Sequence, residues 1–275
     1  MTGFRSRVFL AKGLARLGAK AEIVRRLVYA GHRWPGGRFG VVISFDLDTL
    51  RDEAQLPTVL DVLAREGVHA SFACIGRRVE AEPALYRRIV EGGHEVINHS
   101  YAHGRDGAGG ERRWSDFSDE ERMADIRRAH EVYRRVLGVT CLGFRTPHFD
   151  FVPADREVMV SLGYLYDSSG VDAETNFSGS LPFPAGGVLE IPVWRKASTS
   201  LVLQQEKGGR EVWLARVAAA MDVEIRAGGV LTLFFDPMDL APDGSDLAGI
   251  IRRAREAGAE FCTLKGLSEY LEGKI

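Results

Sequence analysis

The 275-residue chain has few cysteines and no long apolar run. Cys74, Cys141 and Cys262 are odd in number and form no C-x-x-C pair, which argues against a disulfide framework and against a cysteine-based metal site. No stretch reaches the roughly 20 consecutive apolar residues of a membrane-spanning helix. Basic residues interrupt the apolar part of the N-terminus, so it does not resemble a signal peptide. These absences predict reduced, buried thiols in a cytoplasmic protein.

The chain also has little net charge, but the charge is unevenly distributed. The formal total is −2. Residues 1–38 carry nine basic groups and one acidic group, a net charge of +8, whereas the remainder carries 27 basic and 37 acidic groups, a net charge of −10. Because phosphate binding requires basic groups, the acidic part is not expected to bind nucleic acid.

Residues 1–38 form the first of two predicted parts, a basic N-terminal helical extension. Its apolar residues recur at helical spacing, and a basic amphipathic helix can lie on an anionic bilayer. One interpretation is therefore peripheral contact of residues 1–30 with the inner face of the membrane. The alternatives are that the segment packs on the rest of the chain or is simply solvated.

The remaining sequence, from Phe39 to Ile275, alternates between strand and helix patterns. Buried-strand patterns occur at 39–46, 68–75, 92–98, 140–145, 163–166, 188–193, 230–235 and 259–263. Helical patterns occur at 55–66, 80–91, 119–137, 154–162, 211–227, 246–257 and 265–272. Such alternation is typical of a parallel α/β domain, and the number of units favours a (β/α) barrel. We find no internal repeat and no second domain.

Polar residues follow several of these strands where they end. Asp46 and Asp48 end the first strand, and His99 and His103 follow the third. Residues two apart on a strand point to the same side, and the carboxyl ends of parallel strands meet at one mouth of a barrel. Two imidazoles spaced i, i+4 with one carboxylate can form a metal site with open positions for water. Each pattern alone is weak, and their joint occurrence predicts the metal site.

With these residues in view, the sequence resembles the polysaccharide deacetylases of the NodB-homology type, carbohydrate esterase family 4. The motifs that carry the resemblance are FDLD, GHEVINHSYAH, GFRTPHF, YDSS and LTLFFDP, in this order. They span residues 41 to about 265. The resemblance implies that residues 39–275 form a catalytic domain, a distorted NodB-type (β/α) barrel of about seven parallel strands.

The resemblance also implies a reaction and a cofactor. The reaction is hydrolysis of an N-acyl group, acetyl or formyl, on an amino sugar in a polysaccharide, a glycan precursor or a lipid-linked sugar. The cofactor is a divalent metal, most often Zn²⁺, with Co²⁺, Ni²⁺ or Mn²⁺ as alternatives.

The family pattern assigns roles to individual residues. It implies Asp48, His99 and His103 as metal ligands and Asp46 as the general base. Arg145 matches the arginine that holds the base, and Asp167 matches an aspartate that orients the catalytic groups.

The general acid is the point where the sequence departs from the family. Most members end the last large strand in His, whereas this chain has Asp236 followed by Pro237. A carboxyl group can act as an acid only where burial or a neighbouring charge raises its pKa. His148 is an alternative donor with a more suitable intrinsic pKa.

Two rival functions follow. One is an amidohydrolase acting on a small non-sugar amide. The other is a carbohydrate-binding pseudoenzyme that has lost the acid step at Asp236. Neither the oligomeric state nor the acyl group is predicted.

Overall fold

The computed structural model describes Trp34, residues 38–104, Gly110, residues 112–170 and residues 182–271. The extension predicted over residues 1–38 lies outside this part, except for Trp34 and Arg38. No helix within the described ranges is both long enough and apolar enough to cross a bilayer.

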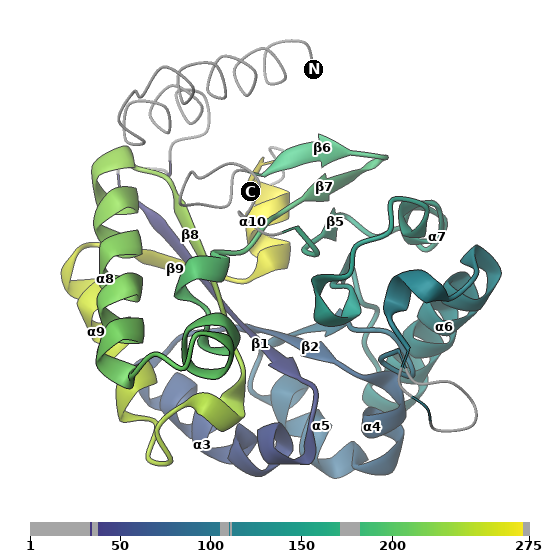
Figure 1. Ribbon diagram of the computed structural model, residues 1–275, viewed down its shortest axis with the longest axis horizontal. Coiled ribbons are helices and arrows are strands. Elements are labelled where there is room, and N and C mark those ends of the chain that lie inside the picture. Colours follow the sequence, from purple (N-terminus) through teal and green to yellow (C-terminus); the bar gives the residue numbers. More distant parts are fainter. Residues whose placement is uncertain (1–33, 35–37, 105–109, 111, 171–181, 272–275) are drawn as a thin grey trace.

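Seven parallel strands form the curved sheet at the centre of the molecule (Figure 1). They are β1 (Gly40–Leu47), β2 (Ser71–Cys74), β3 (Glu95–Asn98), β4 (Gly143–Phe144), β5 (Tyr166–Asp167), β7 (Val188–Glu190) and β8 (Val230–Phe235). Their order is β7-β5-β4-β3-β2-β1-β8, and β6 (Phe183–Ala185) pairs antiparallel with β7 at one edge. A short strand, β9 (Glu260–Cys262), pairs with the first half of β1. The predicted distorted barrel of about seven parallel strands is confirmed.

The two edges of the sheet meet after β7. The amide N–H of Trp194 donates to the carbonyl of Thr232 in β8 at 2.9 Å, and the Thr232 hydroxyl donates to the carbonyl of Pro192 at 2.6 Å. These bonds bring the chain that follows β7 against β8, so the carboxyl ends of the strands surround a common mouth.

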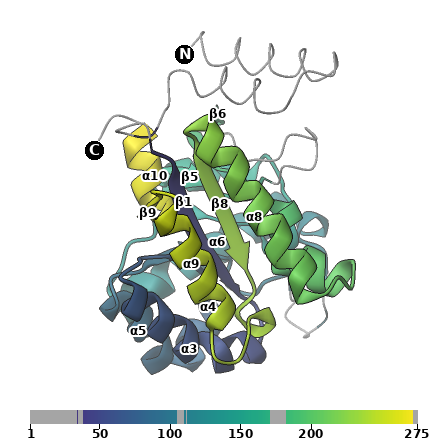
Figure 2. The same cartoon turned by 90° about the vertical axis from the view of Figure 1, so that its left-hand side faces the viewer.

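Helices cover the outside of the sheet. They are α3 (Leu50–Glu66), α4 (Gly76–Ala81), α5 (Pro83–Glu91), α6 (Asp119–Val132), α7 (Asp155–Ser161), α8 (Arg210–Ala227), α9 (Ser245–Glu256) and α10 (Leu264–Leu271). Figure 2 shows α8 and α9 side by side over β1 and β8, with α10 near the start of β1. Leu264 and Leu267 of α10 pack with Val42 and Val230 and close the amino-terminal end of the barrel.

The helix boundaries show which local signals determine structure. Helix α6 begins at Asp119 as predicted, because Ser118 and Glu121 form a capping box. The helix predicted over 55–66 begins earlier, at Leu50, because Thr49 and Asp52 form a second capping box. The helix predicted over 80–91 was wrong as a single element. Pro83 starts a new helix there, since proline lacks the N–H that would continue the first.

The alternation of side chains along β1 places the functional residues. Val41, Ile43 and Phe45 pack in the layer between sheet and helices. Val42, Ser44 and Asp46 alternate with them and therefore face the barrel interior. Phe45 stacks on Phe72 of β2, with ring centroids 5.0 Å apart. Packing on the outer face thus holds Asp46 at the mouth.

The packed unit reaches upstream to Trp34. Its side chain is buried, its amide N–H donates to the carbonyl of Gly228, and its indole N–H donates to Glu260. The ring also lies against Tyr270, with centroids 5.0 Å apart. The barrel therefore includes Trp34 in its packing, four residues before the predicted boundary at Arg38.

Candidate metal centre

The carboxylate of Asp46 is held by a buried arginine. Arg145, at the end of β4, is fully buried, and its Nη1 donates to Asp46 Oδ1 at 2.5 Å. Its Nη2 donates to Ser44 Oγ at 3.0 Å and to Ser168 Oγ at 3.1 Å. Partners on β1 and directly after β5 thus fix the guanidinium, which in turn orients the carboxylate. The structure brings Asp46 and Arg145 together as the sequence predicts.

Asp48 faces both predicted histidine ligands. Asp48 Oδ1 lies 3.2 Å from His99 Nε2 and 3.3 Å from His103 Nε2. Burial by itself raises the pKa of Asp48. The electrostatic interactions of His103 and His99 with the carboxylate outweigh this effect and hold the pKa of Asp48 well below its usual range. Burial lowers the pKa of His99, but Asp48 more than compensates, so the net pKa of His99 is raised.

These three side chains fit a divalent metal. Asp48 Oδ1, His99 Nε2 and His103 Nε2 are buried and have no hydrogen-bond partner among the described residues. The other ring nitrogen of His99, Nδ1, lies 2.7 Å from the carbonyl oxygen of Arg145. Since a carbonyl only accepts, Nδ1 carries the proton and Nε2 presents its lone pair. In a tetrahedral site with bonds of 2.0–2.1 Å, neighbouring donors are about 3.4 Å apart, close to the spacing found here.

The loop after β3 places the two histidines without forming a helix. Ser100 and His103 adopt left-handed backbone conformations, with φ of 66° and 56°. The His103 amide donates to Ser100 Oγ at 2.9 Å, and the Ser100 amide donates to Asn98 Oδ1 at 2.9 Å. Asp125 of α6 accepts from the amides of Tyr101 and Ala102 at 2.5 and 3.1 Å. The imidazoles converge because hydrogen bonds within the loop and hydrogen bonds to Asp125 fix its conformation.

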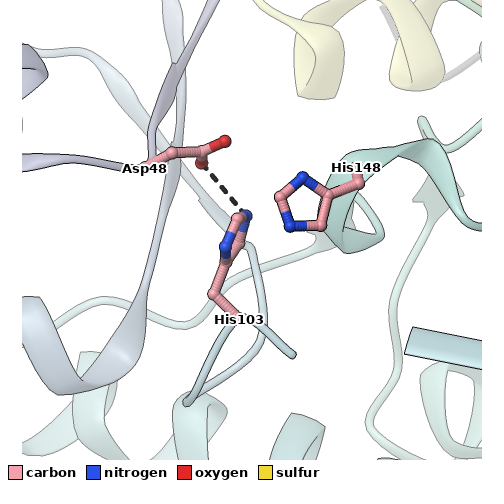
Figure 3. A group of neighbouring side chains, drawn as sticks. All are labelled: Asp48, His103 and His148. Atoms are coloured by element: carbon pink, nitrogen blue, oxygen red, sulfur yellow. Dashed lines mark ion pairs between the residues drawn. The ribbon is translucent and has the colours of Figure 1, made fainter. Parts of the chain in front are cut away.

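His148 lies beside the same site. One ligand atom each from Asp48, His103 and His148 lie within 4.8 Å of one another. Figure 3 shows the His103 and His148 rings converging with the Asp48 carboxylate, each side chain coming from a different segment of the chain. The two ring centroids are 4.5 Å apart, and the planes meet at 62°. The predicted alternative acid is therefore placed at the candidate metal centre.

Asp236, the residue that replaces the expected histidine, is buried at the end of β8. Burial, followed by the negative charges of Asp48, Asp46 and neighbouring acids, raises its pKa well above the usual value. Its amide donates to Thr199 Oγ1 at 2.8 Å, and Gln204 Nε2 lies 3.4 Å from its Oδ2. These surroundings favour a protonated carboxyl group at the mouth.

Asp167 does not contact the metal ligands directly and is linked to the site through Ser169. Its Oδ1 accepts from the amide of Ser169 at 3.0 Å, and its Oδ2 accepts from Arg156 Nε at 3.3 Å. Ser169 Oγ accepts from the amide of Thr146, the residue next to Arg145, at 2.9 Å. Burial raises the pKa of Asp167, and that of its neighbour Glu190 is raised as well. Asp167 thus contacts the turn after Arg145 through Ser169, and its predicted orienting role stays a prediction.

A cavity of about 330 Å³ opens over this arrangement. Asp46, Asp48, His103, His148 and Asp236 line its wall together. The remaining lining residues come from the carboxyl ends of the strands, the first turns of α3 and α4, the loops beside them and the segment at 195–205: Thr49, Asp52, Arg77, Phe149, Arg195, Ser200, Gln204, Gln205, Phe234 and Met238. Four of the lining residues are aspartates, and two, Arg77 and Arg195, are arginines.

The sequence analysis missed two residues that build the site. Asp125 clamps the His99–His103 loop from α6, and Asp52 accepts from the amides of Thr49 and Met238 at 2.9 and 3.0 Å. Asp52 thereby ties the loop after β1 to the turn after β8. The T-x-x-D spacing of a capping box from Thr49 to Asp52 could have indicated Asp52, whereas no local signal marks Asp125.

Known deacetylases share sequence with this chain. A stretch of 47 residues is 51% identical to a chitooligosaccharide deacetylase from Bradyrhizobium sp. (strain ANU 289), covering 17% of this chain and 22% of that protein. Over 166 residues, 57% of each protein, the chain is 24% identical to a peptidoglycan-N-acetylglucosamine deacetylase from Bacillus cereus. The chain thus spans less than two thirds of these relatives.

The fold has a counterpart among solved structures. A candidate polysaccharide deacetylase from Mycobacterium smegmatis superposes with a TM-score of 0.71 at 19% identity, covering 88% of this chain and 93% of that one. Residues 35–166 match the sequence profile of the polysaccharide deacetylase family. This segment contains Asp46, Asp48, His99, His103 and Arg145, whereas Asp167 and Asp236 lie beyond it. Over these residues the chain is similar to the polysaccharide deacetylase family.

Proposed function

We propose that the chain is a metal-dependent hydrolase that removes an N-acyl group, acetyl or formyl, from an amino sugar in a polysaccharide, glycan precursor or lipid-linked sugar. The observation that carries the proposal is the pairing of Asp46 with Arg145 beside the Asp48, His99 and His103 group. Relatives named as chitooligosaccharide and peptidoglycan deacetylases support the amino-sugar substrate.

Asp46 and Asp236 each carry out one of the two proton transfers that the hydrolysis needs. Asp46, fixed through Oδ1 by Arg145, accepts the proton of the attacking water on its other oxygen. A carbon–oxygen bond to water forms and the carbon–nitrogen bond breaks. Asp236, with its raised pKa, gives a proton to the departing amine, which cannot leave readily as an anion.

The metal contributes a separate part of the chemistry. When bound, Zn²⁺ or another divalent ion lowers the pKa of a water and polarises the acyl carbonyl. Asp48, His99 and His103 would hold the ion.

Acyl release from N-acetylated and N-formylated amino sugars tests the proposal, with Asp46→Asn as the matched variant. The variant keeps the size of the side chain and removes the base. We expect it to bind metal as the wild type does and to turn over about 10²- to 10⁴-fold more slowly. Full activity in Asp46→Asn contradicts the role of Asp46. No release of acetate or formate by the metal-loaded wild type contradicts the proposed activity itself.

The pseudoenzyme remains the main rival, because Asp236 stands where the family usually has histidine. It predicts that amino-sugar oligomers bind to the metal-loaded chain while no acyl group is released. The small-amide rival predicts release from a non-sugar amide only. Adding oligosaccharide binding and a panel of small non-sugar amides to the acyl-release assay therefore separates the three functions.

A further inference from the structure

We infer that His148 is a fourth protein ligand of the metal. The inference rests on the proposed function only because that function supplies the metal. It adds a residue to the Asp48, His99 and His103 set that the sequence motifs predict.

The position of the ring is the first observation. Ligand atoms of Asp48, His103 and His148 lie within 4.8 Å of one another. Asp48 Oδ1 also lies 3.2 Å from His99 Nε2. The same carboxylate therefore lies near His99, His103 and His148. The His148 ring meets the His103 ring nearly edge to face, with centroids 4.5 Å apart (Figure 3).

The backbone that carries His148 is the second, independent observation. His148 and Phe149 have φ of 55° and 56°, so two successive residues with side chains adopt the left-handed conformation. L-residues avoid this region, and such strain gathers at functional sites. Phe149 is fixed there by its ring, whose centroid lies 4.8 Å from that of Phe234. The strained turn places the imidazole at the rim of the cavity, next to His103.

The chemistry of the donors fits the same assignment. Three imidazoles and one carboxylate suit Zn²⁺ or Co²⁺ better than a hard ion such as Mg²⁺. The His148 side chain is exposed, whereas His103 is buried, so His148 is the donor that can withdraw when substrate enters. A ligand of this kind would bind the ion only at rest, and the pH profile of His148→Ala decides whether the ring also donates a proton during turnover.

Metal binding without substrate tests the inference. We would load the purified chain with Co²⁺, measure the dissociation constant by competition with a chelator, and record the visible absorption spectrum. We expect His148→Ala to weaken binding by at least about tenfold, the size of effect that even indirect ligand partners show, and to change the Co²⁺ spectrum. His69→Ala removes an exposed histidine just before β2, at the opposite end of the barrel, and should leave both unchanged.

A second measurement uses the wild-type chain and does not depend on the folding of a variant. X-ray absorption of the zinc-loaded wild type should show three imidazoles. Equal affinity and an equal spectrum in His148→Ala, or two imidazoles in the wild type, overturn the inference. If acyl release persists in that case, the proposed function stands without it. If the wild type binds no metal, both fail.

Discussion

A carboxylic acid can donate a proton near neutral pH only where its surroundings oppose ionisation, and Asp236 has such surroundings. Burial and three neighbouring aspartates, Asp48, Asp46 and Asp52, all raise its pKa. The protonated fraction is high below the raised pKa and falls as pH rises through it, so the rate should fall on the alkaline side. Asp236→Asn has no proton to lose. We expect it to lower kcat/KM by about 10²- to 10⁴-fold and to remove the alkaline limb of the pH profile.

His148→Ala is the matched comparison for Asp236. As a metal ligand, His148 should change the metal dependence of the rate and leave the alkaline limb in place. An alkaline limb that persists in Asp236→Asn and disappears in His148→Ala would assign the acid to His148 instead. The profile is measured as kcat/KM at saturating metal for the three proteins.

The ionisable residues at the strand ends could be predicted from the sequence. The residues that position these side chains could not be predicted. Asp46, Asp48, His99, His103 and Arg145 follow buried strands in a fixed order, and parallel strands bring their ends together. Asp125 lies on α6, far along the chain, and nothing local shows that its carboxylate faces the amides of the β3 loop. That contact depends on how the helix packs.

At the scale of elements, the capping boxes of α3 and α6 can be compared, because one lies beside the cavity and the other does not. Thr49 starts α3 at the edge of the cavity, and Ser118 starts α6 away from it. Both hydroxyls accept from the backbone of the third helical residue. Thr49→Ala and Ser118→Ala should each lower the free energy of unfolding by about 1 kcal/mol, measured by urea denaturation.

Only one of these two variants should affect catalysis. Asp52, the partner of Thr49, also accepts from the amide of Met238, so the cap joins the loops after β1 and β8. Thr49→Ala should therefore lower kcat as well, whereas Ser118→Ala should not. Equal kcat in the two variants would show that this cap has no positioning role.

The strands were the more predictable elements, because each is a short apolar run between helical segments. The helices were less predictable at their starts. Ser118 and Glu121 indicated α6 correctly, but the apolar face of α3 begins at Leu56, and its first turn is polar and was missed. The break between α4 and α5 depends on Pro83 at the first helical position. The segment at 195–205, which helps line the cavity, has no pattern that predicted it.

At the scale of the molecule, the charge asymmetry leads to a proposal about location. The strands and the cavity lie within the acidic part of the chain, and the basic run lies before it. We propose that the protein is cytoplasmic and that residues 1–30 hold it peripherally at an anionic inner membrane face, near a lipid-linked glycan. Attraction of basic groups to an anionic surface is worth about 1 kcal/mol for each Lys or Arg.

Replacing Arg5, Arg7 and Lys12 with Gln should therefore weaken partitioning onto phosphatidylglycerol vesicles by about 100-fold. Binding to neutral phosphatidylcholine vesicles should change little, and sedimentation with the vesicles measures both. The replacements are preferable to a deletion that reaches residue 35, because Trp34 packs against Gly228, Glu260 and Tyr270 and its loss would disturb the barrel.

The control for this experiment has the same change in charge at another place. Arg65, Arg87 and Arg127 are exposed on helices of the acidic part, and replacing them with Gln alters the net charge equally. If the net charge alone governed binding, the two triple variants would lose the same affinity. A loss confined to the Arg5, Arg7 and Lys12 variant assigns the membrane contact to the extension. Unchanged vesicle binding in that variant refutes the contact while leaving the barrel and its metal centre unaffected, since none of the three residues lies among those that build the site.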